Sequence, residues 1–104
     1  MQTIATNELK TMMKDNTGLT VVNALPEESA RDAHIPGTPN IPLDSENFVK
    51  QVETQAGGKS KPVVVYCASS GCNVSEKAAR RLESEGFEKV YDYEGGVKAW
   101  QESA

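Results

Sequence analysis

One stretch of the sequence decides the fold: PVVVYCASSGCNVSEKAARRL, at residues 62–82. Its first part, residues 63–66, is a continuous apolar run, which predicts a strand that is covered on both faces. Small and polar residues follow Cys67 and predict a loop, and Asn73 with Glu76 three residues later has the spacing of a capping box. The stretch therefore predicts a strand, a loop and a helix, with Cys67 at the point where the strand ends.

Strand and helix patterns alternate on both sides of this stretch. β-branched and aromatic residues predict strands over residues 19–23 and 88–93, and a very short strand is expected near Asn40 in the proline-rich loop of residues 34–43. The first helix is expected to end in the segment 15–18. Apolar periodicity and capping residues predict helices over residues 6–15, 25–31, 44–54, 73–85 and 97–102. This alternation favours a parallel α/β sheet with helices on both faces, in which ligand sites lie beyond the carboxyl ends of the strands.

The composition narrows the class of protein. The chain has 104 residues, a formal net charge of −4, one histidine and two cysteines, and it suits a single domain over residues 1–104. The negative net charge gives no electrostatic reason to expect binding to nucleic acid or to an anionic membrane. No apolar run approaches the roughly 18 residues of a membrane span, and residues 1–8 lack a signal-peptide pattern, so a cytoplasmic location is expected. One histidine and two cysteines fit a zinc site poorly, so no metal is expected.

The loop after the central strand carries the residues that favour chemistry. A cysteine beside a helix N-terminus is predicted to have a lowered pKa, because free N–H groups there stabilise the thiolate. The small residues at 68–71 allow successive N–H groups to turn inward around an anion, and the hydroxyls of Ser69, Ser70 and Ser75 are further donors. The residue types leave a second interpretation open, in which Cys67 is a buried apolar residue at a strand end.

Further motifs accompany the Cys67 loop. HIPGTPNIP stands at residues 34–42, and EGGVKAW stands at residues 94–100, after Gly86-Phe87 and Tyr91. In this order and spacing the motifs resemble the rhodanese (sulfurtransferase) homology domain, and the resemblance covers about residues 4–100. It implies a rhodanese-like α/β fold with a central, mostly parallel five-stranded sheet and helices on both faces.

The resemblance also implies a reaction. Cys67 aligns with the family's catalytic cysteine, which takes a sulfane sulfur from a donor such as thiosulfate and carries it as a persulfide. An acceptor thiol, or cyanide in the usual assay, then removes the sulfur in a second step, and no metal or organic cofactor is needed. The sulfur would lie in a substrate-binding loop formed by Ala68, Ser69, Ser70, Gly71, Cys72, Asn73, Val74 and Ser75.

The sequence also departs from the family pattern. Many members have Asp-Val-Arg after the second strand, whereas residues 22–26 here read Val-Asn-Ala-Leu-Pro and lack that acid and arginine. The active-site loop contains no arginine, and it is longer than usual if Lys77 marks the start of the family's helix. A longer loop admits a larger oxyanion, as in the related phosphatase and arsenate reductase branch. Without an arginine, phosphate lacks its bidentate partner, so phosphatase activity is disfavoured. Helical spacing predicts that Arg80 and Arg81 point into solvent.

The second cysteine leaves the function open. Cys72 is either a small residue that fills a tight loop or a resolving thiol that takes the persulfide or closes a disulfide with Cys67. The leading hypothesis is a sulfurtransferase with a small sulfur donor and a thiol acceptor as partners and with no assigned oligomeric state. The alternatives are a dithiol redox module that uses both cysteines and a non-catalytic binding module. Structural roles are expected for His34, Tyr91 and Trp100.

Overall fold

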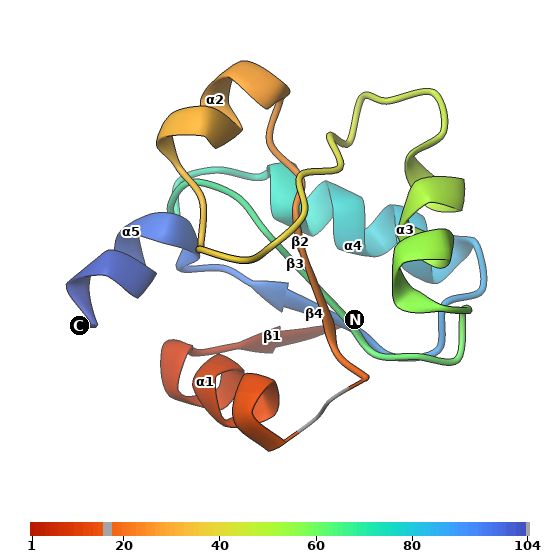
Figure 1. Cartoon of the computed structure of the whole chain (residues 1–104), viewed down its shortest axis with the longest axis horizontal. Coiled ribbons are helices and arrows are strands. Elements are labelled where there is room, and N and C mark those ends of the chain that lie inside the picture. The colour runs from red at the N-terminus through yellow and green to blue at the C-terminus, as the bar shows by residue number, and fades with distance from the viewer. Residues whose placement is uncertain (16–17, 104) are drawn as a thin grey trace.

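The computed structural model describes residues 1–15 and 18–103. Within these residues, a sheet forms in the order β1-β4-β3-β2, and every pair of neighbours is parallel. Figure 1 shows the strands between the helices, in the middle of the molecule. The strands are β1 (Gln2–Ile4), β2 (Thr20–Asn23), β3 (Val63–Tyr66) and β4 (Val90–Tyr93). The parallel α/β class predicted from the alternating pattern is confirmed.

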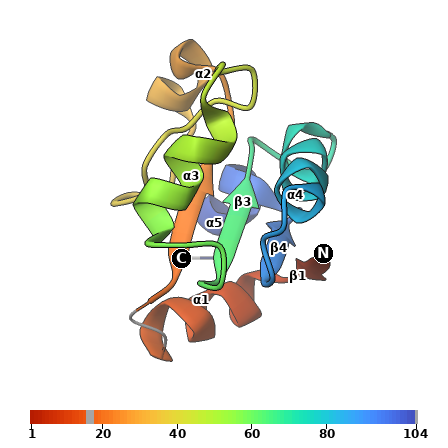
Figure 2. The same ribbon diagram turned by 90° about the vertical axis from the view of Figure 1, so that its right-hand side faces the viewer.

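The helices lie on both faces of the sheet, as the sequence predicts (Figures 1 and 2). The helix expected over residues 44–54 begins later, at Phe48, because residues 44–47 form turns. Residues 16 and 17, where the first helix was expected to end, lie outside the described residues. Among the described helices, none is long and apolar enough to cross a membrane. The helices are α1 (Thr6–Asp15), α2 (Glu27–Asp32), α3 (Phe48–Ala56), α4 (Val74–Ser84) and α5 (Gly96–Glu102).

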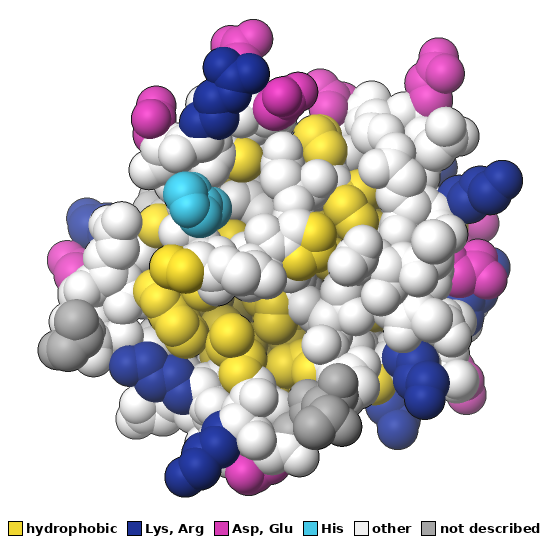
Figure 3. All heavy atoms as spheres, in the orientation of Figure 1, with side chains coloured by type: hydrophobic (Ala, Val, Ile, Leu, Met, Phe, Trp, Pro, Cys, Tyr) yellow, Lys and Arg dark blue, Asp and Glu magenta, His cyan; other side chains and the backbone are white. Residues whose placement is uncertain are grey.

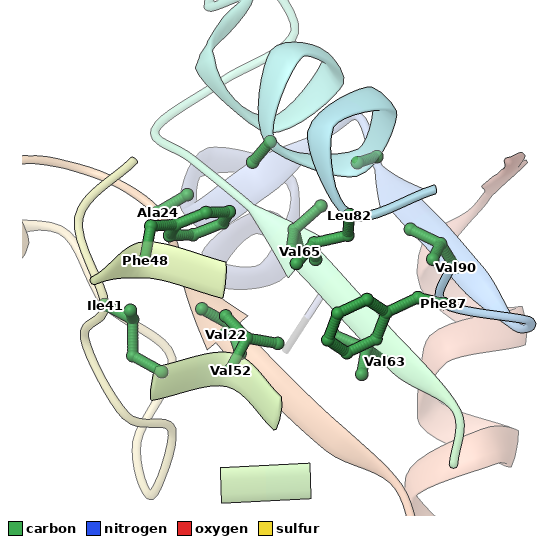
Figure 4. Packing of buried hydrophobic residues seen from close by; sticks show 12 residues of the cluster. Val22, Ala24, Ile41, Phe48, Val52, Val63, Val65, Leu82, Phe87 and Val90 are labelled. Carbon is green, nitrogen blue, oxygen red and sulfur yellow. The ribbon is translucent and has the colours of Figure 1, made fainter. Parts of the chain in front are cut away.

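Two apolar layers cover the sheet. On one face, valines of β2 and β3 pack against α3 and α4, and Figure 4 shows Phe48, Val52 and Leu82 directed at Val22 and Val65. On the other face, side chains of α1 and α5 pack against the alternate strand residues; this layer contains Ile4, Leu9, Val21, Ile35, Val64, Tyr66, Tyr93 and Val97. Every residue of β3 is buried, as its continuous apolar run predicts.

The number of strands differs from the five that the family resemblance implies. Where a further strand was expected, Asn40 makes only an isolated parallel bridge with Asn23. The Asn23 N–H donates to the Pro39 carbonyl and the Ile41 N–H donates to the Asn23 carbonyl, both at 2.9 Å. Pro39 and Pro42 flank this bridge, and because proline has no N–H the ladder does not extend. The described sheet therefore has four strands.

Strand β1 is an element that the sequence pattern does not predict. It pairs with β4, and Gln2, Thr3 and Ile4 lie opposite Tyr91, Asp92 and Tyr93. Its first two residues are exposed and only Ile4 is buried, so it carries no apolar run. Tertiary pairing, rather than local pattern, makes this segment a strand.

Candidate active site

Cys67 lies at the carboxyl end of β3, one residue after Tyr66. Its exposed fraction is 0 %, and it packs in a small apolar cluster with Leu25 and Ala30. Sites of parallel α/β sheets lie at this end of the strands. The sheet thus fixes the position of the Cys67 backbone, and the surrounding apolar residues remove its side chain from water.

The first half of the loop, residues 67–69, is attached to the start of α5. The Val97 N–H donates to the Cys67 carbonyl at 3.1 Å, and the Lys98 N–H donates to the Ala68 carbonyl at 3.0 Å. The first N–H groups of a helix have no partner within the helix, and here they bind the loop. The backbone on both sides of the Cys67 side chain is therefore held by a second element as well as by β3.

Gly96 makes this attachment possible. Its φ is +63°, in the left-handed region. A Cβ atom at this position would lie 2.4 Å from the Cys67 carbonyl oxygen and 2.9 Å from the Ser69 nitrogen, closer than real side chains approach. The second glycine of the EGGVKAW motif is thus required by the close approach of α5 to the loop, a role that the motif alone does not reveal.

The second half of the loop, residues 70–73, is held more lightly. The Cys72 N–H donates to the Ser69 carbonyl at 3.0 Å, which closes a turn. Asn73 precedes α4, but its side chain makes no capping hydrogen bond, so the predicted capping box is wrong. The ψ angle of Asn73 is 6°, whereas an N-cap residue normally has an extended backbone from which its side chain reaches the first turn.

One hydrogen bond joins the Cys67 thiol to the backbone of Cys72, and the two thiols have different acidities. The Cys67 thiol donates to the Cys72 carbonyl over 3.5 Å. Burial raises the pKa of Cys67, the hydrogen bond with Cys72 raises it further, and hydrogen bonding by Ser75 only partly opposes this. The lowered pKa predicted for Cys67 is therefore wrong in direction, because that prediction included the helix N-terminus but not the burial of the sulfur.

The pKa of Cys72 shifts in the opposite direction. Its partial burial disfavours the thiolate, but hydrogen bonding from Cys67 and from the backbone of Val74 and Ala68 outweighs burial, so the pKa of Cys72 is lowered. The charge of Asp92 acts weakly against this lowering. At any given pH, a larger fraction of Cys72 than of Cys67 is consequently ionised.

The remaining loop residues named from the sequence surround these thiols. Ser75 is buried at the start of α4, while Ser70, Gly71 and Asn73 are exposed or partly exposed, as are Ala68, Ser69, Cys72 and Val74. Beside the loop is a hollow of about 180 Å³ that is lined by Ala24, Pro26, Leu43, Asp44 and Val74. The loop therefore contains a partly exposed cysteine, Cys72, and a buried one, Cys67.

The proline-rich motif has structural contacts. His34 lies at the surface (Figure 3), and its Nδ1 is 3.1 Å from the Ala30 carbonyl of α2. The Tyr66 hydroxyl accepts a hydrogen bond from the Ile35 N–H at 2.9 Å and bonds the Thr38 hydroxyl at 2.5 Å. The proline-rich loop is thus tied to the end of β3, one residue before Cys67.

The arginines of α4 lie at the surface in contact with solvent, as predicted. Arg80 pairs with Glu76 at 3.1 Å and Arg81 pairs with Glu85 at 3.6 Å, and all four side chains are largely exposed. Tyr91 and Trp100 pack against the apolar layer beneath α1 and α5. The structural roles expected for these two aromatic residues are confirmed.

Fold and site together define a class: a parallel α/β domain with a cysteine loop at the carboxyl end of its central strand. The family model of the rhodanese-like domain matches residues 5–103. The chain belongs to this family.

Known relatives share this domain within longer proteins. YrkF of Bacillus subtilis, named as a candidate sulfur carrier protein, is 28% identical over 97 residues, which are 93% of this chain and 49% of that protein. The tRNA uridine(34) hydroxylase of Escherichia fergusonii is 38% identical over 66 residues, 62% of this chain and 18% of that enzyme. The chain thus spans half or less of the length of these curated relatives. The crystal structure of Alr3790 from Anabaena has a TM-score of 0.82, 26% identity, and coverage of 97% of this chain and 87% of that one.

Proposed function

We propose that the protein is a sulfurtransferase that moves a sulfane sulfur from a small donor such as thiosulfate to a thiol through a persulfide on Cys67. The observation that carries this proposal is the position of Cys67 in a rhodanese-like chain. It is the residue that follows β3, and its carbonyl accepts a hydrogen bond from the first turn of α5. A nucleophile at such a junction of rigid elements is well placed for covalent catalysis.

Two displacement steps account for the reaction. The Cys67 thiol loses its proton, and the thiolate attacks the outer sulfur of thiosulfate; a new S–S bond forms, the S–S bond of thiosulfate breaks, and sulfite leaves. An acceptor thiolate then attacks the outer sulfur of the persulfide, and Cys67 leaves as a thiolate. Sulfur changes carrier and no external oxidant or reductant is consumed.

The loop chemistry favours a sulfur donor over a phosphate ester. Residues 67–75 contain no lysine or arginine, and the arginines of α4 pair with glutamates on the helix surface. A phosphate in the loop would lack a bidentate cation. We therefore expect negligible hydrolysis of aryl phosphates. The acidic net charge also supports the expectation of small sulfur compounds, rather than nucleic acid, as partners, and a cytoplasmic location stays a prediction.

A dithiol redox module is the second candidate function, and one observation favours it. The Cys67 thiol already contacts the Cys72 backbone, and the pKa of Cys72 is lowered, which favours Cys72 as the attacking thiol of the pair. On oxidation, the two thiols would lose two protons and two electrons to an oxidant such as a disulfide and form one S–S bond. The same pair allows Cys72 to take the outer sulfur from a Cys67 persulfide.

Kinetics of two single variants test the proposal. Cys67→Ser is expected to abolish thiosulfate–cyanide turnover, whereas Cys72→Ser retains it and changes the lifetime of the persulfide. The Cys72→Ser variant is the matched control because it makes the same atomic replacement in the same loop. Full turnover in Cys67→Ser with none in Cys72→Ser would overturn the assignment, and aryl-phosphate turnover without thiosulfate turnover would overturn the class of reaction.

A further inference from the structure

The hollow beside the active-site loop is not used by any step of the proposed reaction. Its volume is about 180 Å³, and its lining is apolar apart from one acid; it consists of Ala24, Pro26, Leu43, Asp44 and Val74. Pockets for drug-sized ligands begin at about 300 Å³, so this hollow suits a molecule of only a few heavy atoms.

The strand register places the hollow next to Cys67. Asn23 lies opposite Tyr66 in the ladder between β2 and β3, so the residues that follow them, Ala24 and Cys67, are level with each other. The Ala24 N–H donates to the Tyr66 carbonyl at 3.0 Å and continues this ladder beyond the strands. Neighbouring strands lie about 4.8 Å apart. One residue of the lining is therefore a single strand spacing from the backbone of the proposed nucleophile.

The side chain of Val74 connects the hollow with the cysteine. Val74 packs against the apolar layer that contains Ala24 and also against the small cluster that contains Cys67. On the other side of the hollow, the Leu43 N–H donates to the Ala24 carbonyl at 3.1 Å, which fixes the proline-rich loop against the end of β2. A molecule held between Leu43 and Val74 would thus lie beside the residue proposed to carry the sulfur.

The charge of the hollow is negative. Asp44 is the charged residue of its lining, is exposed, and forms no ion pair within residues 1–15 and 18–103. On the neighbouring helices α2 and α4, Arg31 and Arg80 pair with glutamates of their own helices, at 3.4 and 3.1 Å. Acidic side chains predominate at the end of the molecule where α2 lies (Figures 1 and 3). The hollow therefore favours a ligand with a positive group and disfavours a carboxylate.

We propose that this hollow binds the sulfur acceptor and that the acceptor is a short aminoalkyl thiol, with its carbon chain between Leu43 and Val74 and its ammonium group beside Asp44. The inference rests on the proposed function, because it names the substrate class of the same site. The acceptor thiolate attacks the outer sulfur of the Cys67 persulfide; an S–S bond to the acceptor forms, the bond from that sulfur to Cys67 breaks, and Cys67 leaves as a thiolate. The product is an aminoalkyl persulfide, and no oxidant or reductant is consumed.

Binding can be measured without sulfur transfer, by NMR titration of the wild-type protein. Propylammonium chloride is the probe, because a methyl group replaces the thiol of cysteamine, and sodium propionate is the probe of opposite charge. Propylammonium is expected to shift the amide signals of Ala24, Leu43 and Val74 with saturation, whereas propionate at equal ionic strength shifts none of them. No shifts with propylammonium, or equal shifts with both probes, would overturn the inference whether or not the protein transfers sulfur.

The acceptor role is tested on protein that has been loaded with thiosulfate and freed of excess donor. Discharge by cysteamine, 2-mercaptoethanol and mercaptoacetate is followed by intact mass, and each rate is expressed per thiolate. Cysteamine is expected to react at least about tenfold faster than mercaptoacetate, with 2-mercaptoethanol between them. Equal rates would overturn this inference and leave the persulfide on Cys67 standing. A protein that takes up no sulfur would contradict the proposed function and the acceptor role, while the NMR titration still decides whether the hollow binds an alkylammonium ion.

Variants of Asp44 test the origin of the preference. Asp44→Asn is expected to lower the ratio of the cysteamine rate to the mercaptoacetate rate by about fivefold, and Asp44→Lys to lower it further. Asp15→Asn is the matched control, because Asp15 is exposed at the end of α1, which packs on the opposite face of the sheet. It makes the same replacement and the same change in net charge, and should change the ratio by less than about twofold. An unchanged ratio in Asp44→Asn, or an equal fall in Asp15→Asn, would overturn the inference.

Discussion

The two halves of the loop between β3 and α4 are held in different ways. In the first half, α5 donates two backbone hydrogen bonds to the carbonyls of Cys67 and Ala68, at a contact so close that only glycine fits at position 96. In the second half, Cys72 has one backbone hydrogen bond, which closes a turn, and a long one from the Cys67 thiol to its carbonyl, and Asn73 provides no side-chain cap for α4. The difference gives a fixed, buried sulfur at one end of the loop and a lightly held, partly exposed sulfur at the other.

Disrupting the contact between α5 and the first half of the loop should have the largest effect on stability and turnover. Gly96→Ala places a methyl group against the Cys67 carbonyl and requires a left-handed backbone, so we expect a loss of about 3 kcal/mol or more in the free energy of unfolding. Thiosulfate turnover should fall with it, because the backbone of Cys67 must move. Denaturant unfolding and steady-state kinetics measure the two effects.

A glycine in the lightly held half is the control for this change. A methyl group at Gly71 would meet open space, with nothing within 4 Å, and the φ of Gly71 is not positive. Gly71→Ala should therefore change the free energy of unfolding by less than about 1 kcal/mol. If Gly71→Ala and Gly96→Ala lowered the free energy of unfolding equally, the two halves of the loop would be held equally firmly by the rest of the fold.

The pH dependence of alkylation sharpens the comparison of the two sulfurs. The raised pKa of Cys67 means that its thiolate forms only at higher pH, and the lowered pKa of Cys72 means that its thiolate forms earlier as pH rises. Near neutral pH we therefore expect iodoacetamide to label Cys72 at least about tenfold faster than Cys67. Peptide mass spectrometry measures the ratio, and the unfolded protein should label both at similar rates. Faster labelling of Cys67 in the folded protein would reverse the assignment of the two acidities.

The smallest effect is expected at the start of α4. Because the Asn73 side chain makes no capping hydrogen bond, Asn73→Ala should lower the free energy of unfolding by less than about 0.5 kcal/mol, compared with about 1 kcal/mol for a working cap. Thermal or denaturant unfolding detects this difference. A loss of about 1 kcal/mol or more would mean that Asn73 caps α4 in solution and that this half of the loop is held more firmly than described.

Much of the fold could be predicted because the patterns that indicate its helices and strands are formed by residues close together in the sequence. The apolar run of β3 and the alternation of helix and strand patterns predict a covered parallel sheet, and the carboxyl-end rule then places Cys67 at the site. Strand β1 could not be predicted in this way, since two of its three residues are exposed and polar. The bridge at Asn40 is also a tertiary outcome, limited by the prolines on either side of it.

The site was harder to predict because its chemistry depends on burial. The position of Cys67 follows from the sequence, but the direction of its pKa shift does not, since the apolar cluster around it forms only in the fold. Gly96 belongs to the EGGVKAW motif of residues 94–100. Its contact with Cys67 could not be predicted, because the two residues are far apart in the chain.

Intact mass spectrometry after incubation with thiosulfate tests the central claim, that the fixed and buried sulfur carries the persulfide. The account predicts one added sulfur atom on the wild-type protein and on Cys72→Ser, and none on Cys67→Ser. Treatment with cyanide should then return each mass to its starting value. An added sulfur on Cys67→Ser together with none on Cys72→Ser would contradict the account and make Cys72 the sulfur-carrying residue.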